Sequence, residues 1–271
     1  MESIWTSETV LPRFPSLRGD LRTDVLVIGG GLAGLLCAHR LTELGVENVL
    51  VEAADLCGGM TKNTTAKITA QHGLIYDKLL RRFGAERARM YLEANQAALR
   101  EYRRLCAKVD CGFETRDAFV YARRDRAKLE REARALENLG VPAELVEEVP
   151  LPFSTVGALR FNGQAQFDPL RFAAAVAKGL RIYEHTPVLE LAAGTAVTPE
   201  GRIRAEKMIV CTHFPILNKH GSYFLKMYQH RSYVLALENT SDVGGMYVDE
   251  AEDGLSFRNA GDLLLLGGGG H

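Results

Sequence analysis

The sequence has no apolar run of about 18 residues, the length that a membrane-spanning helix requires, so it predicts no membrane span. Its first residues, Met1 to Asp20, are polar and contain prolines, and they lack the apolar core of a secretory signal. A cytoplasmic protein without a membrane partner is therefore expected. Its 33 Lys and Arg residues balance 34 Asp and Glu residues, so no nucleic-acid partner is expected either.

Cysteine is scarce, and its odd number and scattered spacing fit no disulfide framework. The five cysteines are Cys37, Cys57, Cys106, Cys111 and Cys211. Cys211-Thr212-His213 is a C-x-H sequence, which is half of what a Rieske-type cluster requires. Its other half, C-x-x-H, is absent, so the sequence predicts no metal site.

Glycine, in contrast, is concentrated in one informative place. The stretch from Asp24 to Gly34 reads DVLVIGGGLAG, an apolar strand that runs into a G-x-G-x-x-G turn before a helical segment. A second apolar strand, 49–51, ends in Glu52, about 20 residues further on. Strand, glycine turn, helix and acid in this order predict a β-α-β unit that binds a dinucleotide.

Each residue of this motif has a physical role in that interpretation. Gly29 permits the tight turn, Gly31 lets the backbone approach a pyrophosphate, and Gly34 lets the helix pack closely on the strand. The start of the helix offers unpaired N–H groups to phosphate oxygens. Glu52 is placed to accept hydrogen bonds from the adenosine ribose, and its charge disfavours a 2′-phosphate. The alternative is a glycine-rich turn in another kind of α/β protein.

The remaining elements alternate between helical and extended patterns. Residues 57–73 form a hydroxyl-rich loop that leads into a short helical stretch. Helices are predicted at 75–108 with a break at Gly84, at 126–139, and at 169–180 with Asp168 as the cap. Strands are predicted at 113–122, 158–161, 181–183, 187–191, 207–211, 223–238, 245–249, 255–258 and 262–266. This order implies two discontinuous, interleaved domains.

Beyond the glycine motif, the sequence resembles the FAD-dependent oxidoreductases of the glycine/D-amino-acid oxidase superfamily. It is most similar to the bacterial subgroup that often carries a C-terminal Rieske domain. The resemblance extends from about Trp5 to His271. Its more specific segments are GGMTKNTTAKITAQHGLIYDKL, CGFETRDAFVYAR, NGQAQFDPLRF, IVCTHFPILNKHGSYFLKMYQHRSYVLAL and LSFRNAGDLLLLGGGGH.

The resemblance implies an α/β fold, with a Rossmann-like FAD-binding domain and an interleaved, mostly antiparallel α+β substrate domain. We expect the FAD-binding domain at 1–110 and 164–215, and an incomplete substrate domain at 111–163 and 216–271. Members of the superfamily continue for about another hundred residues, a domain-scale length, beyond the last matching segment. A C-terminally truncated chain is therefore expected.

The resemblance also implies residue roles. Gly29, Gly31 and Gly34 would carry the FAD pyrophosphate and Glu52 the adenosine ribose. The other expected cofactor-binding residues are Thr61, Lys62 and Thr65 of the hydroxyl-rich loop, Val188 at the adenine, and Thr212 after a strand. At Thr212 the chain departs from the family, which has an alanine–threonine–glycine-like turn where this chain has Cys211-Thr212-His213.

For the intact family, the resemblance implies oxidation of an amine or amino acid by hydride transfer to the flavin, with an acceptor that the sequence does not identify. Lys67 is the candidate for the cation that stabilises the reduced ring, and Gln71 and His72 are candidates to face the ring or the substrate. Two alternatives remain open. One is an NAD-dependent dehydrogenase, and the other is a non-catalytic fragment that binds a nucleotide.

Overall fold

The structure is a computed structural model that describes residues 3–216 and 222–270. The chain forms two compact units, each built from two separate segments. Unit 1 comprises Met1–Thr64 and Asp168–Gln229, and unit 2 comprises Thr65–Phe167 and His230–His271. Unit 1 is an α/β layer with a largely parallel sheet, and unit 2 is a mostly antiparallel α+β layer. The predicted fold class is thereby confirmed.

The boundaries of the units differ from the domain boundaries expected from the sequence. Residues 65–110 belong to unit 2, because their short strand β3 (Lys67–Ile68) pairs with β6 (Gly157–Gln166) and their long helix packs on another helix of that unit. Residues 164–167 also belong to unit 2, because β6 continues to Gln166. Of the residues from 216 onward that were expected in the substrate domain, the described residues 216 and 222–229 belong to unit 1.

Unit 1 contains a six-stranded sheet in the order β7-β2-β1-β10-β9-β8. The strands are β1 (Leu21–Ile28), β2 (Asn48–Val51), β7 (Ile182–Tyr183), β8 (Glu190–Ala192), β9 (Thr195–Thr198) and β10 (Gly201–Val210). The first four strands of this order run parallel, and β9 and β8 fold back against β10 as an antiparallel extension. The carboxyl ends of β1, β2 and β10 meet at one edge, because Ile28 pairs in register with Val51 and Val210.

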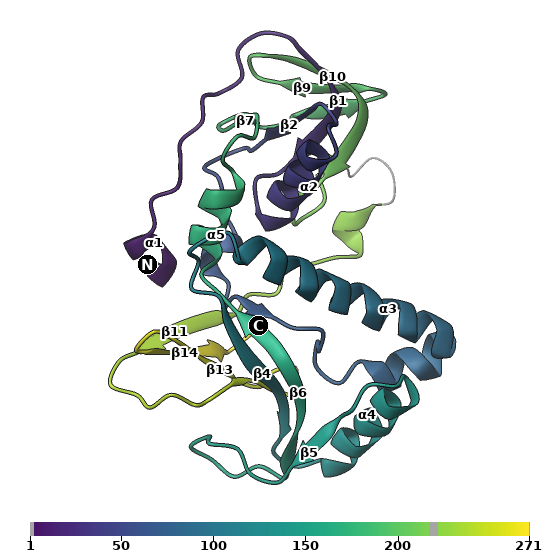
Figure 1. The fold of residues 1–271 in the computed structure, drawn as a ribbon. Helices are drawn as coiled ribbons and strands as arrows, with labels where there is room; N and C mark the ends of the chain where they lie inside the picture. The colour runs from purple at the N-terminus through teal and green to yellow at the C-terminus, as the bar shows by residue number, and fades with distance from the viewer. Residues whose placement is uncertain (1–2, 217–221, 271) are drawn as a thin grey trace. The chain divides into compact units, whose positions relative to one another are not determined.

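The apolar parts of β1 and β2 are buried, as is typical of parallel strands. All four residues of β2 are buried, and so are the last four of β1. Helix α2 (Leu32–Glu43) crosses over between β1 and β2 and packs against both, as Figure 1 shows. This arrangement is the predicted β-α-β unit.

The other helices of unit 1 are short. They are α1 (Ile4–Glu8), α5 (Pro169–Val176) and the 3₁₀ helices η1 (Thr61–Asn63) and η2 (Tyr223–Leu225). The predicted cap of α5 is confirmed, since the carboxylate of Asp168 accepts hydrogen bonds from the backbone N–H groups of Leu170 and Arg171. The helix ends at Val176, four residues before the predicted end.

Unit 2 contains an eight-stranded sheet in the order β11-β14-β13-β12-β4-β6-β3, with β5 paired to β6. The strands not yet given are β4 (Glu114–Ala122), β5 (Glu144–Val146), β11 (Tyr233–Leu237), β12 (Met246–Asp249), β13 (Ser256–Ala260) and β14 (Leu263–Gly268). Within unit 2, β12 and β4 form the only parallel pairing among the described strands.

Helices α3 (Tyr76–Cys106) and α4 (Arg126–Asn138) pack against each other in unit 2. The predicted break in α3 is found at Gly84, whose φ of 80° is outside the helical range. Glu132 of α4 is fully buried, and its carboxylate accepts hydrogen bonds from the backbone N–H groups of Tyr76 (2.7 Å) and Asp77 (2.8 Å). It therefore caps the first turn of α3 from a neighbouring helix.

Several predicted elements were wrong in their bounds: the predicted strands 207–211 and 158–161 correspond to parts of the longer strands β10 and β6. Residues 223–238 were predicted as one strand, but only 233–237 pair with β14, and 223–225 form η2. The predicted strand 187–191 begins only at Glu190, because Pro187 has no backbone N–H for a ladder. The predicted helical stretch within 57–73 is the single turn η1, and Lys67 lies in β3.

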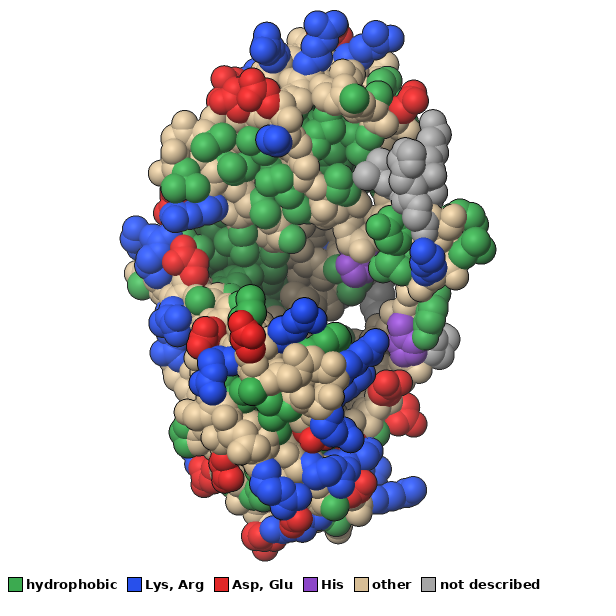
Figure 2. All heavy atoms as spheres, turned by 90° about the vertical axis from the view of Figure 1, so that its right-hand side faces the viewer, with side chains coloured by type: hydrophobic (Ala, Val, Ile, Leu, Met, Phe, Trp, Pro, Cys, Tyr) green, Lys and Arg blue, Asp and Glu red, His purple; other side chains and the backbone are tan. Residues whose placement is uncertain are grey.

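On the face shown in Figure 2, basic and acidic side chains are interspersed. Ion pairs form along α3 between Arg81 and Asp77 and between Arg104 and Glu101. The side chains of Arg81 and Arg104 are exposed to solvent. Within the described ranges, no helix has both the length and the apolar character needed to cross a membrane.

Candidate functional site

Unit 1 contains a cavity of about 760 Å³ at the edge where the carboxyl ends of β1, β2 and β10 meet. Ile28, Val51 and Val210, the last residues of these strands, all line it. The remaining lining comes from the glycine turn, residues 57–61, residues 186–188, residues 211–216 and Tyr223. Open α/β sheets bind ligands at this edge, where the loops after the strands converge.

The glycine turn is closed so tightly that two of its glycines admit no side chain. Gly29 has a φ of +109°, and a Cβ added there would lie 2.6 Å from the carbonyl oxygen of Cys211. A Cβ on Gly34 would lie 1.9 Å from the carbonyl oxygen of Gly29. Gly34 therefore sets the close packing of α2 on the turn, which is the role that the sequence predicts, and it does not line the cavity.

Gly31 serves a different purpose, because its backbone is extended and any residue could adopt it. It is the N-cap of α2 and, having no side chain, leaves the first turn of the helix open to the cavity. A Cβ there would lie 3.4 Å from the hydroxyl oxygen of Thr61. The start of α2 therefore presents backbone N–H groups and the positive end of a helix dipole to the cavity.

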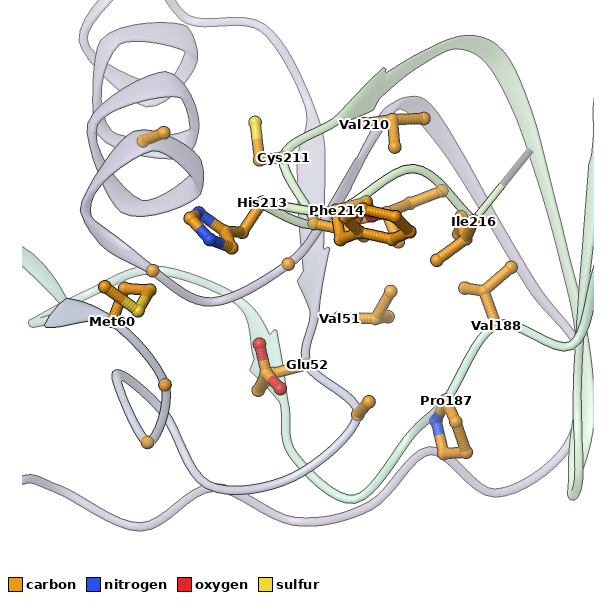
Figure 3. A pocket seen from close by; sticks show the side chains of 18 of the residues that line it. Val51, Glu52, Met60, Pro187, Val188, Val210, Cys211, His213, Phe214 and Ile216 are labelled. Carbon is orange, nitrogen blue, oxygen red and sulfur yellow. The ribbon is translucent and has the colours of Figure 1, made fainter. Parts of the chain in front are cut away.

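Glu52 follows β2 and lies at the cavity wall, as Figure 3 shows. One carboxylate oxygen accepts a hydrogen bond from the N–H of Gly30 (2.6 Å), and the other accepts one from the N–H of Ala54 (2.9 Å). These bonds fix the carboxylate, and each oxygen retains a lone pair for a further donor. A fixed acceptor of this kind suits a pair of ribose hydroxyls.

Thr61 is buried in η1 and borders the same end of the cavity. Its hydroxyl oxygen accepts a hydrogen bond from the N–H of Leu32, the first residue of α2, at 3.2 Å. The predicted hydroxyl-rich loop is thereby attached to the start of the helix. The neighbouring Cys57 is also buried, and burial raises the pKa of its thiol to about 12, so that it remains neutral.

Residues 211–214 form a tight turn after β10. The N–H of Cys211 donates to the carbonyl oxygen of Ile28 at 2.7 Å, which extends the pairing with β1. The N–H of Phe214 donates to the carbonyl oxygen of Thr212 at 2.6 Å, and the hydroxyl of Thr212 donates to the carbonyl oxygen of Phe214 at 2.8 Å. Thr212 lines the cavity, but its hydroxyl stabilises the turn.

The cavity has an apolar side opposite the glycine turn. Figure 3 shows Val188 and Ile216 on this side, with Val51 and Phe214 between them and the turn. Val188 belongs to the irregular segment that precedes β8. Among the described residues, no hydrogen-bond partner is found for its backbone N–H. An apolar slot beside backbone polar groups is suited to a flat heterocycle such as adenine.

Not all of the residues predicted from the sequence come together here. Gly29, Gly31, Glu52, Thr61, Val188 and Thr212 line the cavity. Lys62 lies in η1 outside the lining, and its carbonyl oxygen accepts a hydrogen bond from the hydroxyl of Ser3. Thr65 belongs to unit 2, where its hydroxyl oxygen accepts a hydrogen bond from the ammonium group of Lys67 at 3.3 Å.

The three predicted catalytic residues all lie in unit 2. Burial and the charge of Arg258 lower the pKa of Lys67 to about 7. Gln71 is buried, and in the described part of the chain neither polar atom of its carboxamide has a hydrogen-bond partner. Desolvation lowers the pKa of His72, and its Nδ1 lies 2.8 Å from the hydroxyl of Tyr91.

Sequence reasoning missed several residues that line the cavity. Met60, Phe214 and Ile216 lie in loops, where apolar residues give no periodic signal. From the sequence, His213 was noted as part of a C-x-H half-motif and of a departure from a family pattern, and not as a residue of the binding site. Among the described residues, no three His, Cys, Asp or Glu side chains form a group that could hold a metal ion, and all five cysteines are free thiols.

Residues 24–271 match the family model of the FAD dependent oxidoreductases, called DAO. The chain belongs to this family, as its glycine turn and downstream segments predict. FAD is the cofactor of this family.

Individual relatives place the chain within that family. It is 38% identical, over 288 residues, to the Bacillus subtilis (strain 168) protein YhfW, which is named as a Rieske 2Fe-2S iron-sulfur protein. The match covers 100% of this chain and 57% of YhfW. The chain is 25% identical over 217 residues to the gamma-glutamylputrescine oxidoreductase of Escherichia coli (strain K12), with 73% of this chain and 50% of that protein covered.

Among solved structures, L-proline dehydrogenase from P. horikoshii has a TM-score of 0.73 with 16% sequence identity. That similarity covers 94% of this chain and 70% of the dehydrogenase, and it shows a shared fold. The chain spans 57% and 50% of the lengths of the two curated relatives.

Proposed function

We propose that unit 1 binds FAD in the cavity at the start of α2, and that the chain forms the cofactor-binding part of an oxidoreductase that acts on an amine or an amino acid. One observation carries this proposal. The N-terminus of a 12-residue helix, capped by a glycine without a side chain, opens into a cavity bordered by the ends of three parallel strands.

The residues of the cavity fit the adenosine diphosphate half of FAD. The start of α2 supplies backbone N–H donors for a pyrophosphate. The pyrophosphate can approach these donors because Gly31 has no side chain. The carboxylate of Glu52 is held by two backbone bonds at a place where it can accept from ribose hydroxyls. Val188 and Ile216 offer apolar surface for the adenine ring.

Bound FAD would supply the hydride acceptor for oxidation of a C–H bond adjacent to an amine nitrogen. The residues of unit 1 bind and orient the nucleotide. Thr61 attaches residues 57–61 to the start of α2, and Thr212 fixes the turn that closes the cavity. The carboxylate of Glu52 also repels a 2′-phosphate, which disfavours NADP.

Unit 2 supplies the proposed catalytic side chains. A lysine whose pKa is lowered to about 7 can hold or release a proton near neutral pH, and Lys67 is the candidate for stabilising negative charge on the reduced ring. The buried carboxamide of Gln71 retains a donor and an acceptor for a bound molecule. His72 is the third candidate. Unit 2 is accordingly proposed as the substrate domain.

Amine or amino-acid chemistry is supported by the names of similar proteins, an L-proline dehydrogenase and a gamma-glutamylputrescine oxidoreductase. These names support an amine or an amino acid as the substrate class of this chain. Its cytoplasmic location stays a prediction from the sequence.

The test is a calorimetric titration of the purified chain with FAD, ADP and NAD. Tighter binding of FAD than of ADP or NAD is expected, because FAD shares the adenosine diphosphate contacts and adds those of the flavin. Tighter binding of NAD than of FAD would favour a dehydrogenase instead. Equal affinity for ADP and FAD would favour a fragment that binds only the adenine half, and no binding by any of the three would contradict the proposal.

A further inference from the structure

His213 occupies a backbone conformation that glycine normally takes. Its φ is +62°, and the hydrogen bond from the N–H of Phe214 to the carbonyl oxygen of Thr212 closes a three-residue turn around it. A turn of this kind with positive φ at its centre is rare and strained for a residue that has a Cβ. Such strain persists only where the surrounding structure enforces it, and it concentrates at ligand sites.

The surrounding structure enforces this turn from both sides. Before His213, the N–H of Cys211 continues the ladder of β10 with β1. After it, the hydroxyl of Thr212 donates to the carbonyl oxygen of Phe214. The direction of the His213 side chain is therefore set by the edge of the sheet.

That direction leads to the glycine turn. His213 lines the cavity together with Gly31 and Met60, and Figure 3 shows its imidazole directed toward the first turn of α2. The apolar slot of Val188 and Ile216 lies on the other side of the cavity. The imidazole thus lies at the end where backbone N–H groups are presented, and away from the proposed adenine position.

The charges of the cavity suit an anion at this end. Among its described lining residues, Glu52 is the only carboxylate and His213 the only imidazole, and Lys and Arg are absent from the lining. The oxygens of Glu52 already accept from Gly30 and Ala54. Among the described lining residues, His213 is therefore the only one whose side chain offers an N–H group to a phosphate oxygen.

We propose that His213 is a pyrophosphate-binding residue, whose ring N–H donates to a phosphate oxygen of the nucleotide held at the start of α2. This inference rests on the proposed function and adds a residue to it. A glycine at this position would relax the turn. The chain has a histidine instead, and its side chain would reach the phosphates from the side opposite α2.

The test measures the affinity of the wild type, His213→Gly and His213→Asn for ADP and for adenosine by calorimetry. Glycine relaxes the backbone and removes the ring, whereas asparagine tolerates positive φ and retains a shorter donor. We expect His213→Gly to lower the affinity for ADP about tenfold and to leave adenosine binding unchanged, since a hydrogen bond to a charged group is lost. His213→Asn should lie between the glycine variant and the wild type.

The outcomes separate this inference from the proposed function. If the wild type binds ADP and adenosine, and His213→Gly binds ADP equally well, the role of His213 is wrong and the nucleotide site stands. Equal losses for ADP and adenosine would show that His213 shapes the cavity without contacting phosphate, which also overturns the inference. If the wild type binds neither ligand, both proposals fail. Thermal unfolding of each variant checks the fold. The unfolding midpoint of His213→Gly is expected to lie at or above that of the wild type.

Discussion

The carboxylate of Glu52 accepts a hydrogen bond of 2.6 Å from the backbone N–H of Gly30. This bond joins the end of β2 to the glycine turn after β1, so the acid and the turn of the motif form one rigid wall of the cavity. A Cβ on Gly30 would lie 2.9 Å from the Cβ of Glu52, which shows how closely the two segments approach. In the motif the acid follows the glycine turn by about 20 residues. The structure gives the reason for this spacing, because the acid ends the neighbouring strand and there reaches the backbone of the turn.

Glu52→Gln is expected to weaken adenosine binding about tenfold and to reduce discrimination against a 2′-phosphate. The amide oxygen can replace only one of the two carboxylate acceptors, and the negative charge is lost. Competition between ADP and 2′-phosphorylated ADP, measured by calorimetry, gives the ratio of affinities. An unchanged ratio in the variant would show that Glu52 does not face the ribose.

Gly31→Leu is expected to abolish nucleotide binding, with a loss of at least about a hundredfold in affinity for ADP. Its side chain would extend from a Cβ 3.4 Å from the Thr61 hydroxyl, at the place where a pyrophosphate would approach the start of α2. Gly59→Ala is the matched control, because Gly59 also lines the cavity but its Cβ would meet nothing within 4 Å. Unchanged ADP affinity in Gly31→Leu would contradict the assignment of the phosphate site.

Glu132→Ala is expected to destabilise unit 2 by about 2–4 kcal/mol, because two backbone N–H groups in the first turn of α3 lose their buried acceptor. Glu132→Gln retains one acceptor oxygen and should lose less. Denaturant unfolding followed by circular dichroism measures both. A loss under about 0.5 kcal/mol in the alanine variant would mean that water replaces the carboxylate.

Lys67 makes the stability of the chain depend on pH. Burial and Arg258 lower its folded pKa to about 7, whereas an unfolded lysine keeps a pKa near 10.5, so between these values the unfolded state binds more protons. Wild-type stability should therefore rise with pH across this window, by about 1 kcal/mol per unit, relative to Lys67→Met. Below about pH 7 the charged, buried ammonium group should make the wild type the less stable protein. A stability difference independent of pH from 6 to 10 would contradict the lowered pKa.

The nucleotide-binding unit could be predicted from the sequence because its determinants are local. The strand before Gly29, the helix after Gly31 and the strand before Glu52 each follow from apolar pattern and glycine spacing within 30 residues. Asp168 and Gly84 were also identified correctly, since a helix cap and a helix break depend on one residue and its neighbours.

The parts that could not be predicted depend on contacts between distant residues. The extent of β11 is set by its pairing with β14, about 30 residues further on, and not by its own apolar pattern. Residues 65–110 belong to unit 2 because β3 pairs with β6, about 100 residues away. The place of His213 in the cavity follows from the pairing of β10 with β1, across some 180 residues. Single-sequence periodicity carries no information on such pairings.

The most direct test of the account is an absorbance spectrum of the purified chain, recorded before and after incubation with excess FAD and desalting. The account predicts that flavin bands remain after desalting in the wild type and are absent in Gly31→Leu, because the start of α2 holds the pyrophosphate. A wild-type chain that is folded by circular dichroism and retains no flavin would contradict the claim that the residues present here form an FAD site.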